Sequence, residues 1–220
     1  MQKEKKTKGS SEYNQISISE TLKRPTFYKL GENVSIGEGC EIVGAERISI
    51  GNNVMIRKDC WLNIVINQNY KKKPGIIIDD GCQIGKNFTI SVSNRAHIEQ
   101  NVLIGANVYI ADCGHAYENI AIPIMHQGIS SETNEVSIGE GSWLGINSVI
   151  VGNVRVGKGS IVAANSFINK DVPNYSVVAG NPGKIIKMFD SVSRTWRKVH
   201  NDEDIQFILK NRVSPSKLSI

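Results

Sequence analysis

The chain has 220 residues, 40% apolar content and a formal net charge of +5. This length and apolar content are sufficient for one domain with a full hydrophobic core. It lacks an apolar run near the ~18 residues of a membrane helix, and no apolar stretch follows its lysine-rich start, so neither a membrane span nor a secretory signal is expected. It also lacks the aromatic and basic modules that read nucleic acid. We therefore expect a cytoplasmic protein without a nucleic-acid partner.

Residues 1–30 are predicted to form an N-terminal tail and cap. This segment is weakly patterned, and lysines cluster at positions 3, 5, 6 and 8. Such tails are ordinarily solvated, but a lysine-rich tail can also associate peripherally with anionic lipid headgroups.

Aliphatic residues then recur every six positions, and this period predicts a parallel β-helix over residues 31–187. The uninterrupted stretch is Ile138, Leu144, Ile150, Val156, Val162 and Ile168. The same register continues backwards through Ile36, Ile42, Ile50, Ile56, Leu62, Ile78, Ile84, Ile90, Ile98, Ile104 and Ile110.

Insertions into the period all fall at one point of the predicted coil. When the aliphatic positions are grouped in threes, the first four coils carry 2, 10, 2 and 22 extra residues, each time between the second and third position. This pattern is typical of a triangular prism with loops extruded at one corner, often the binding face. The longest loop runs from Ala111 to about Glu135 and contains His115 and His126.

The four cysteines do not suggest a disulfide framework. Cys40, Cys60 and Cys82 lie two positions before an aliphatic position, where a small inward side chain is expected. Cys113 lies near His115 and could be a nucleophile, but its spacing supplies no orienting partner of the kind that a Cys-His pair requires.

Residues 188–220 are predicted to form a C-terminal helical segment that covers the open end of the solenoid. The six-residue period ends after Val172, and apolar residues follow at roughly helical spacing: Val192, Trp196, Val199, Ile205, Ile208 and Leu209. Asn201, followed by three acidic residues, resembles a helix N-cap.

The combined motifs resemble the hexapeptide-repeat acyltransferases, and most closely the galactoside, maltose and surface-polysaccharide O-acetyltransferases. The matching segments are Asp112-Cys113-Gly114-His115, Ile138-Gly139, Trp143-Leu144-Gly145, Val156-Gly157, residues 169–173 (Asn-Lys-Asp-Val-Pro) and residues 178–184 (Val-Ala-Gly-Asn-Pro-Gly-Lys). The resemblance implies a left-handed parallel β-helix, a homotrimer and acetyl-CoA as acyl donor, with no metal.

His115 is the candidate catalytic base. A sugar hydroxyl is a poor nucleophile at neutral pH, and an imidazole with a pKa near ~6.5 is suited to take its proton. By resemblance, the histidine at this position does so while the hydroxyl oxygen attacks the thioester. Asp112 could orient His115, contact the substrate or cap the loop.

The same resemblance assigns the coenzyme site. Gly145 and Ile146 would supply backbone donors to the oxyanion. Trp143, Ala163 and Ala164 would line the groove for the coenzyme arm, although the family commonly has Gly-Ala-Gly where this chain has Ala163-Ala164-Asn165. The residues expected near the nucleotide and its phosphates are Asn169, Lys170 and Lys184.

The predicted acceptor is a saccharide, as in enzymes that acetylate capsular, exopolysaccharide or lipopolysaccharide precursors, and Asn94 is a candidate contact. Alternative acceptors are an amino-sugar nucleotide, serine or a xenobiotic. A γ-type carbonic anhydrase would share the fold but needs three zinc-binding histidines, and the close pair among them is missing here. A non-catalytic scaffold is the remaining alternative.

Overall fold

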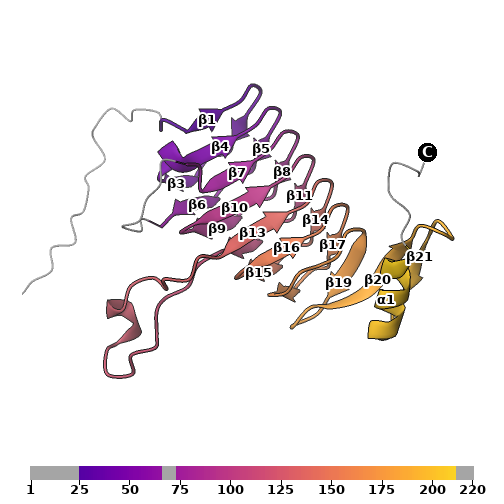
Figure 1. Ribbon diagram of the computed structural model, residues 1–220. Helices are drawn as coiled ribbons and strands as arrows, with labels where there is room; N and C mark the ends of the chain where they lie inside the picture. The colour runs from indigo at the N-terminus through magenta and orange to yellow at the C-terminus, as the bar shows by residue number, and fades with distance from the viewer. Residues whose placement is uncertain (1–24, 66–72, 212–220) are drawn as a thin grey trace, which may run out of the picture.

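The computed structural model describes residues 25–65 and 73–211. The predicted tail at residues 1–30 therefore lies largely outside the described residues. Residues 25–211, apart from the short gap, form one stack of coils with a C-terminal extension (Figure 1).

Three sheets make up the stack, and each coil contributes one strand to each sheet. Sheet A contains β1 (Lys29–Leu30), β4 (Ile48–Ile50), β7 (Ile76–Ile78), β10 (Arg95–Ile98), β13 (Glu135–Ile138) and β16 (Val154–Val156). Sheet B begins with β2 (Ser35–Ile36), β5 (Met55–Ile56), β8 (Gln83–Ile84), β11 (Leu103–Ile104), β14 (Trp143–Leu144) and β17 (Ile161–Val162). Sheet C contains β3 (Glu41–Val43), β6 (Trp61–Ile64), β9 (Thr89–Val92), β12 (Tyr109–Ala111), β15 (Val149–Val151) and β18 (Phe167–Ile168).

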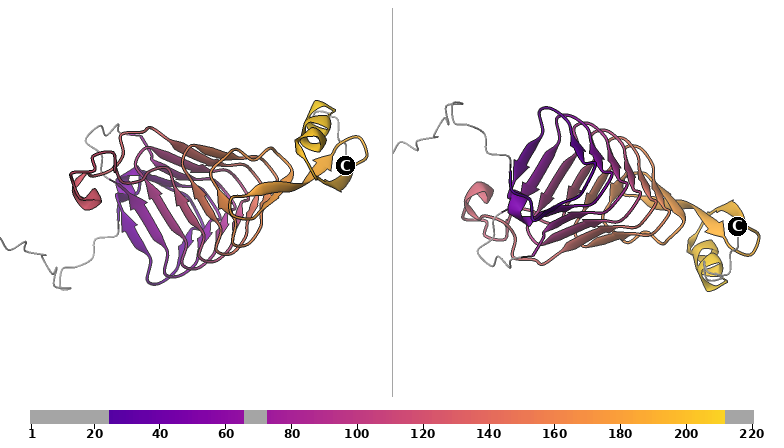
Figure 2. Two further views of the ribbon diagram at one scale, coloured as in Figure 1. Left: turned by 90° about the horizontal axis from the view of Figure 1, so that it is seen from below. Right: turned by 90° about the horizontal axis from the view of Figure 1, so that it is seen from above.

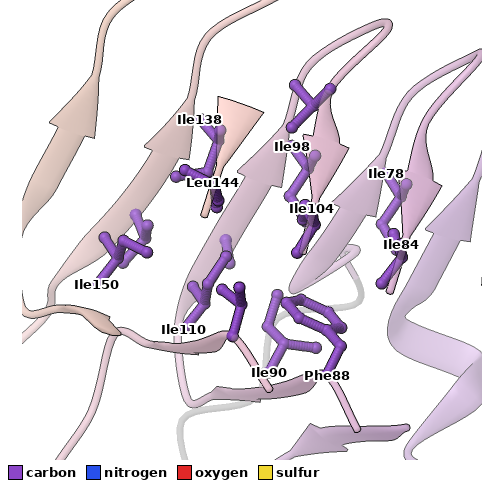
Figure 3. Close-up of a cluster of buried hydrophobic side chains, with 14 of the residues drawn as sticks. Ile78, Ile84, Phe88, Ile90, Ile98, Ile104, Ile110, Ile138, Leu144 and Ile150 are labelled. Carbon is purple, nitrogen blue, oxygen red and sulfur yellow. The ribbon is translucent and has the colours of Figure 1, made fainter. Parts of the chain in front are cut away.

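The six-residue period corresponds to these strands, and the prediction of a parallel β-helix is confirmed in its architecture. The three groups of aliphatic positions are the three sheets, since Ile84, Ile90 and Ile98, for example, lie on sheets B, C and A. Their side chains stack in the interior (Figure 3) and are almost fully buried. Ile36 and Ile42 are less buried because β2 and β3 have a neighbouring strand on one side only.

An asparagine ladder forms the corner between sheets B and C. Asn87, Asn107, Asn147 and Asn165 adopt φ values of 55°, 58°, 60° and 59°, the left-handed region that asparagine tolerates better than most residues. Each side-chain amide donates to the next along the stack, at 2.9, 2.9 and 3.0 Å. Asn165 therefore fits the tight turn at the point where the sequence departs from Gly-Ala-Gly.

The insertions lie at the corner between sheets C and A, as predicted. The longest joins β12 to β13 across residues 112–134 and includes a short 3₁₀ helix, η2 (Ile124–His126). Figure 1 shows this loop extending away from the stack. A second 3₁₀ helix, η1 (Ala45–Arg47), occupies the same corner in the first coil.

The C-terminal segment is only partly helical. The strands β19 (Ser176–Ala179), β20 (Lys184–Asp190) and β21 (Thr195–Lys198) extend sheet B, and β20 and β21 pair antiparallel. The helix α1 spans Asp202–Lys210, and the predicted cap is confirmed because Asn201 Oδ1 accepts from Asp204 N at 2.9 Å.

The expectation that helical spacing extends through Val192, Trp196 and Val199 is wrong, because Trp196 lies in β21. The open edge of sheet B offers unpaired N–H and C=O groups, and pairing with that edge satisfies the backbone over residues 184–198. Among the described residues, no helix has the length and apolar character needed to span a membrane.

Removing one interior side chain should weaken the stack measurably. Ile138 is fully buried, so we expect Ile138→Ala to lower the free energy of unfolding by ~2–5 kcal/mol, through lost burial and the cavity left behind. Urea denaturation measures this change. Ser137→Ala, at the adjacent outward position, is the matched control and should change stability by less than ~0.5 kcal/mol; equal effects would contradict the inward assignment.

Candidate active site

The loop that carries His115 is held at its stem. His115 and Ile129 form an antiparallel bridge. Ala116 N donates to Gly128 O at 3.0 Å, and Ser130 N donates to Gly114 O at 2.8 Å. The backbone at His115 is thus fixed on both sides, while the residue itself is exposed to solvent.

Asp112 caps the corner from which the loop starts. It is fully buried, and its carboxylate accepts hydrogen bonds from Ser93 N at 2.7 Å, Asn94 N at 2.8 Å and Arg95 N at 2.6 Å. Burial raises the pKa of Asp112 above its usual value, and the three N–H donors oppose that shift. Of the roles considered for Asp112, loop capping is the one that these contacts support.

Asn94 connects the two ends of the same loop. Its backbone N–H binds Asp112 at the start of the loop, and its side-chain Nδ2 donates to Asn134 O at the end, at 2.8 Å. The sequence suggested Asn94 as an acceptor contact, but not this function. The two-residue insertion before Arg95 places Asn94 at the same corner one coil earlier, but the sequence does not show which residue of the loop its side chain meets.

Cys113 does not have the environment of a reactive thiol. Burial raises its pKa to about 11, with the charge of Asp112 acting in the same direction. At neutral pH the side chain is therefore a neutral thiol, and it contacts Ser91 O at 3.7 Å.

The residues expected to line the coenzyme groove lie on sheet B and its corner with sheet C. Trp143, in β14, faces outward with 48% of its surface exposed. Gly145 packs against the next coil so closely that a Cβ would lie 2.6 Å from Ala164 N. Of the two oxyanion donors expected here, Gly145 is not free, because its N–H donates to Val162 O at 2.7 Å. Within the described residues, the N–H groups of Ile146 and Ala164 have no acceptor, so these two backbone donors remain available at the corner.

The residues expected near the nucleotide lie together at the last coil. Asn169 and Lys170 follow β18, and Lys184 begins β20. Gly183 N donates to Phe167 O at 2.8 Å, which places the start of β20 against β18. All three side chains are exposed.

A single chain separates these residues into two groups. His115 follows β12 at the corner between sheets C and A, whereas Trp143 lies on sheet B and Ile146 at the corner between sheets B and C. If all of them serve one reaction, the base and the groove must come from different chains or be brought together by movement of the loop.

Among the described residues, His97 is the histidine whose side chain has a hydrogen-bond partner. His97 Nε2 lies 2.8 Å from Asp79 Oδ2 on sheet A. Over the described ranges, no three His, Cys, Asp or Glu side chains are grouped as a metal site requires.

Two family models match the repeats. "Bacterial transferase hexapeptide (six repeats)" matches residues 135–170, and "Hexapeptide repeat of succinyl-transferase" matches residues 75–111. Both matches lie within the stack and together include strands of all three sheets. The fold and the repeats define a hexapeptide-repeat transferase.

Similar proteins agree with this class. WbbJ of Escherichia coli K12, described as a candidate O-acetyl transferase of lipopolysaccharide biosynthesis, is 27% identical over 69% of this chain and 87% of its own length. Serine acetyltransferase 2 of Arabidopsis thaliana is 37% identical, but the match covers 54% of this chain and only 39% of that protein. The chain has the repeats and the stacked coils of the hexapeptide-repeat acyltransferases and is similar to WbbJ over most of both chains.

A solved structure shows the same fold. AntD, an N-acyltransferase from Bacillus cereus determined in complex with dTDP and coenzyme A, has a TM-score of 0.61 and 21% identity. The match covers 84% of this chain and 92% of AntD.

The Asp112 cap should be sensitive to loss of its charge. Asp112→Asn keeps the size but points an amide N–H₂ at backbone donors, so we expect the free energy of unfolding to fall by ~1–3 kcal/mol. Chemical denaturation measures the change. Asp59→Asn is the control, because that side chain is 51% exposed. Unchanged stability in Asp112→Asn would show that the cap is dispensable.

Proposed function

We propose that the protein is an acetyl-CoA-dependent O-acetyltransferase that acetylates a hydroxyl of a saccharide, with His115 as general base. The observation that carries the proposal is the exposed His115 on a stem fixed by backbone hydrogen bonds, where a solvent-accessible imidazole can meet an acceptor. The Asp112 cap anchors this stem to the stack.

The reaction follows from the chemistry of the groups. The imidazole of His115 takes the proton of the acceptor hydroxyl as its oxygen attacks the acetyl carbonyl carbon. The free N–H groups of Ile146 and Ala164 are placed to stabilise an oxyanion or to bind the amides of an extended coenzyme arm. The carbon–sulfur bond then breaks, and the proton held by His115 passes to the departing thiolate.

The donor assignment is supported by the groove and by the fold relative. Trp143 offers an exposed indole beside the corner, and the small side chains of Ala163 and Ala164 are half-buried and exposed, respectively. Lys170 and Lys184 are exposed cations suited to phosphates. AntD, which shares the fold, was determined with coenzyme A.

The acceptor class is supported by the match to WbbJ, which extends over most of both chains. The match to serine acetyltransferase favours serine as a second candidate, and an AntD structure determined with dTDP-4-amino-4,6-dideoxyglucose favours an amino-sugar nucleotide. Profiling acetyl transfer to a neutral sugar, an acidic sugar, serine and an amino-sugar nucleotide distinguishes these acceptors.

We further propose that the active site lies between chains of a cytoplasmic homotrimer of left-handed triangular prisms. The separation of His115 from Trp143 and Ile146 in one chain supports this arrangement. A neighbouring copy could present its corner between sheets B and C to the loop of the first.

His115→Ala should lower the acetyl-transfer rate by ~10²- to 10⁴-fold, because it removes the base, while acetyl-CoA binding should persist. Steady-state kinetics and calorimetric titration measure the two effects. His126→Ala, in η2 of the same loop, is the control and should retain activity. A fully active His115→Ala enzyme would refute the assignment of the base.

A site shared between chains should allow complementation. His115→Ala removes the base, and Ala164→Trp fills the proposed coenzyme corner, so each variant alone should be inactive. After the two are unfolded together and refolded at equal amounts, ~a quarter of the sites should combine an intact His115 with an intact corner. Activity no greater than that of the separately refolded variants would contradict a shared site.

A further inference from the structure

The hairpin formed by β20 and β21 is strongly basic. Its segment 184–198 contains five basic residues and a single acid, Asp190. That carboxylate is already engaged, since Asp190 Oδ2 accepts from Arg197 Nη1 at 3.2 Å and from Ser193 Oγ at 3.0 Å. Within segment 184–198, the other basic side chains therefore have no acidic side chain left to pair with.

Two of the lysines face each other directly. Lys187 pairs with Lys198 across the antiparallel ladder, so their side chains project from the same face. Within the described residues, neither has a carboxylate partner. Like charges directly opposite each other disfavour the hairpin, and an anion placed between them removes that repulsion.

Aromatic rings lie beside the lysine pair on the same face. The next outward pair along the strands is Phe189 and Trp196, about 7 Å further on by strand geometry. Their ring centroids are 5.8 Å apart in an edge-to-face arrangement, and Tyr175 packs on Phe189 at 6.5 Å. Trp196 keeps 43% of its surface exposed, so an indole surface remains open to a ligand.

The hairpin face, defined as Lys187, Phe189, Trp196 and Lys198, continues the outward surface of sheet B. The pairing register runs from Trp143 through Ile161 and Val177 to Lys187 and Lys198. Four strand spacings of about 4.8 Å put Lys198 roughly 19 Å from Trp143. A long ligand held at the hairpin face could thus extend along the sheet to Trp143, at the proposed coenzyme groove.

We propose that the hairpin face binds an acidic saccharide, with a sugar ring against Trp196 and a carboxylate or phosphate substituent between Lys187 and Lys198. The proposal rests on the proposed function in that the saccharide is the acceptor or a part of it. Within the hairpin face, Trp196 is the one strongly exposed apolar side chain, so this face suits a single sugar ring better than a membrane surface, into which a larger apolar face inserts. Of the lysines proposed for the coenzyme phosphates, Lys170 follows β18, and Lys184 begins β20 three residues before Lys187, where the neighbouring Gly183 N donates to Phe167 O.

Calorimetric titration of the full-length protein with an oligogalacturonate, a phosphorylated mannan and a neutral malto-oligosaccharide tests the proposal. We expect the acidic probes to bind and the neutral probe to bind at least about tenfold more weakly, with affinity falling as salt is raised. The double variant Lys187→Gln/Lys198→Gln should lose about tenfold or more in affinity for the acidic probes, and Trp196→Ala about fivefold.

Matched variants exclude a general effect of charge or of an exposed ring. Lys58→Gln/Lys86→Gln removes two exposed lysines from neighbouring coils, and Trp61→Ala removes an indole that is 41% exposed on sheet C. Both should bind the acidic probes as the parent does. Because Lys187→Gln/Lys198→Gln relieves repulsion, its unfolding midpoint should not fall, which separates lost binding from lost folding.

Several results would overturn the inference. These are equal binding of acidic and neutral probes, unchanged affinity in the Lys187→Gln/Lys198→Gln variant, or displacement of the acidic probes by anionic lipid vesicles or single-stranded DNA at equal charge concentration. Acetyl-CoA binding is measured on the same samples. Its absence would refute the proposed transferase, whereas normal acetyl-CoA binding without selectivity for acidic saccharides would refute only the inference.

Discussion

Backbone pairing between successive coils is the interaction on which the rest of the structure depends. Every coil must return in register with the one before it, so that Ile84 meets Ile104 and Ile90 meets Ile110. This requirement fixes the six-residue period and buries at least one aliphatic side chain in each strand from β4 to β18. It also requires tight turns at the corners. At the corner between sheets B and C, the asparagines from Asn87 to Asn165 adopt the left-handed backbone conformation that such a turn needs.

The candidate site uses the part of the coil that this constraint leaves free. Insertions accumulate at the corner between sheets C and A, where a loop can leave without breaking the stack. A buried carboxylate, Asp112, ties the departing chain to the backbone of the preceding coil, and Asn94 holds its return. The corner at Gly145 tolerates no added atoms, because close contact with the next coil leaves no room for a side chain.

The sequence predicts the stack well because its information is local and repeated. Ile138, Leu144 and Ile150 identify three sheets by spacing alone, and the extra residues identify the corner. Loop capping is among the roles that the sequence suggests for Asp112, but its partners, the backbone N–H groups of residues 93–95, depend on which residues of the preceding coil lie opposite and become visible only in the fold. The sequence pattern around Trp196 predicts a helix, because over so few residues an amphipathic spacing fits a helix and a strand equally well. Trp196 lies in a strand because backbone pairing at the open edge of sheet B extends through β20 to β21. His115 and Trp143 were identified by resemblance, yet their separation within one chain becomes visible only in the fold.

The antiparallel turn after β19 also has a consequence for how such a chain can change in length. Parallel coils can be added or removed between existing ones with little disturbance, because each contacts only its neighbours. The reversal into β20 and β21 ends that series, so growth must occur inside the stack. Each coil inserted after β14 would carry the hairpin about 4.8 Å further from Trp143. The number of coils therefore sets the distance between the hairpin and Trp143. Duplication of a single repeat unit would change that distance without altering either end of the chain.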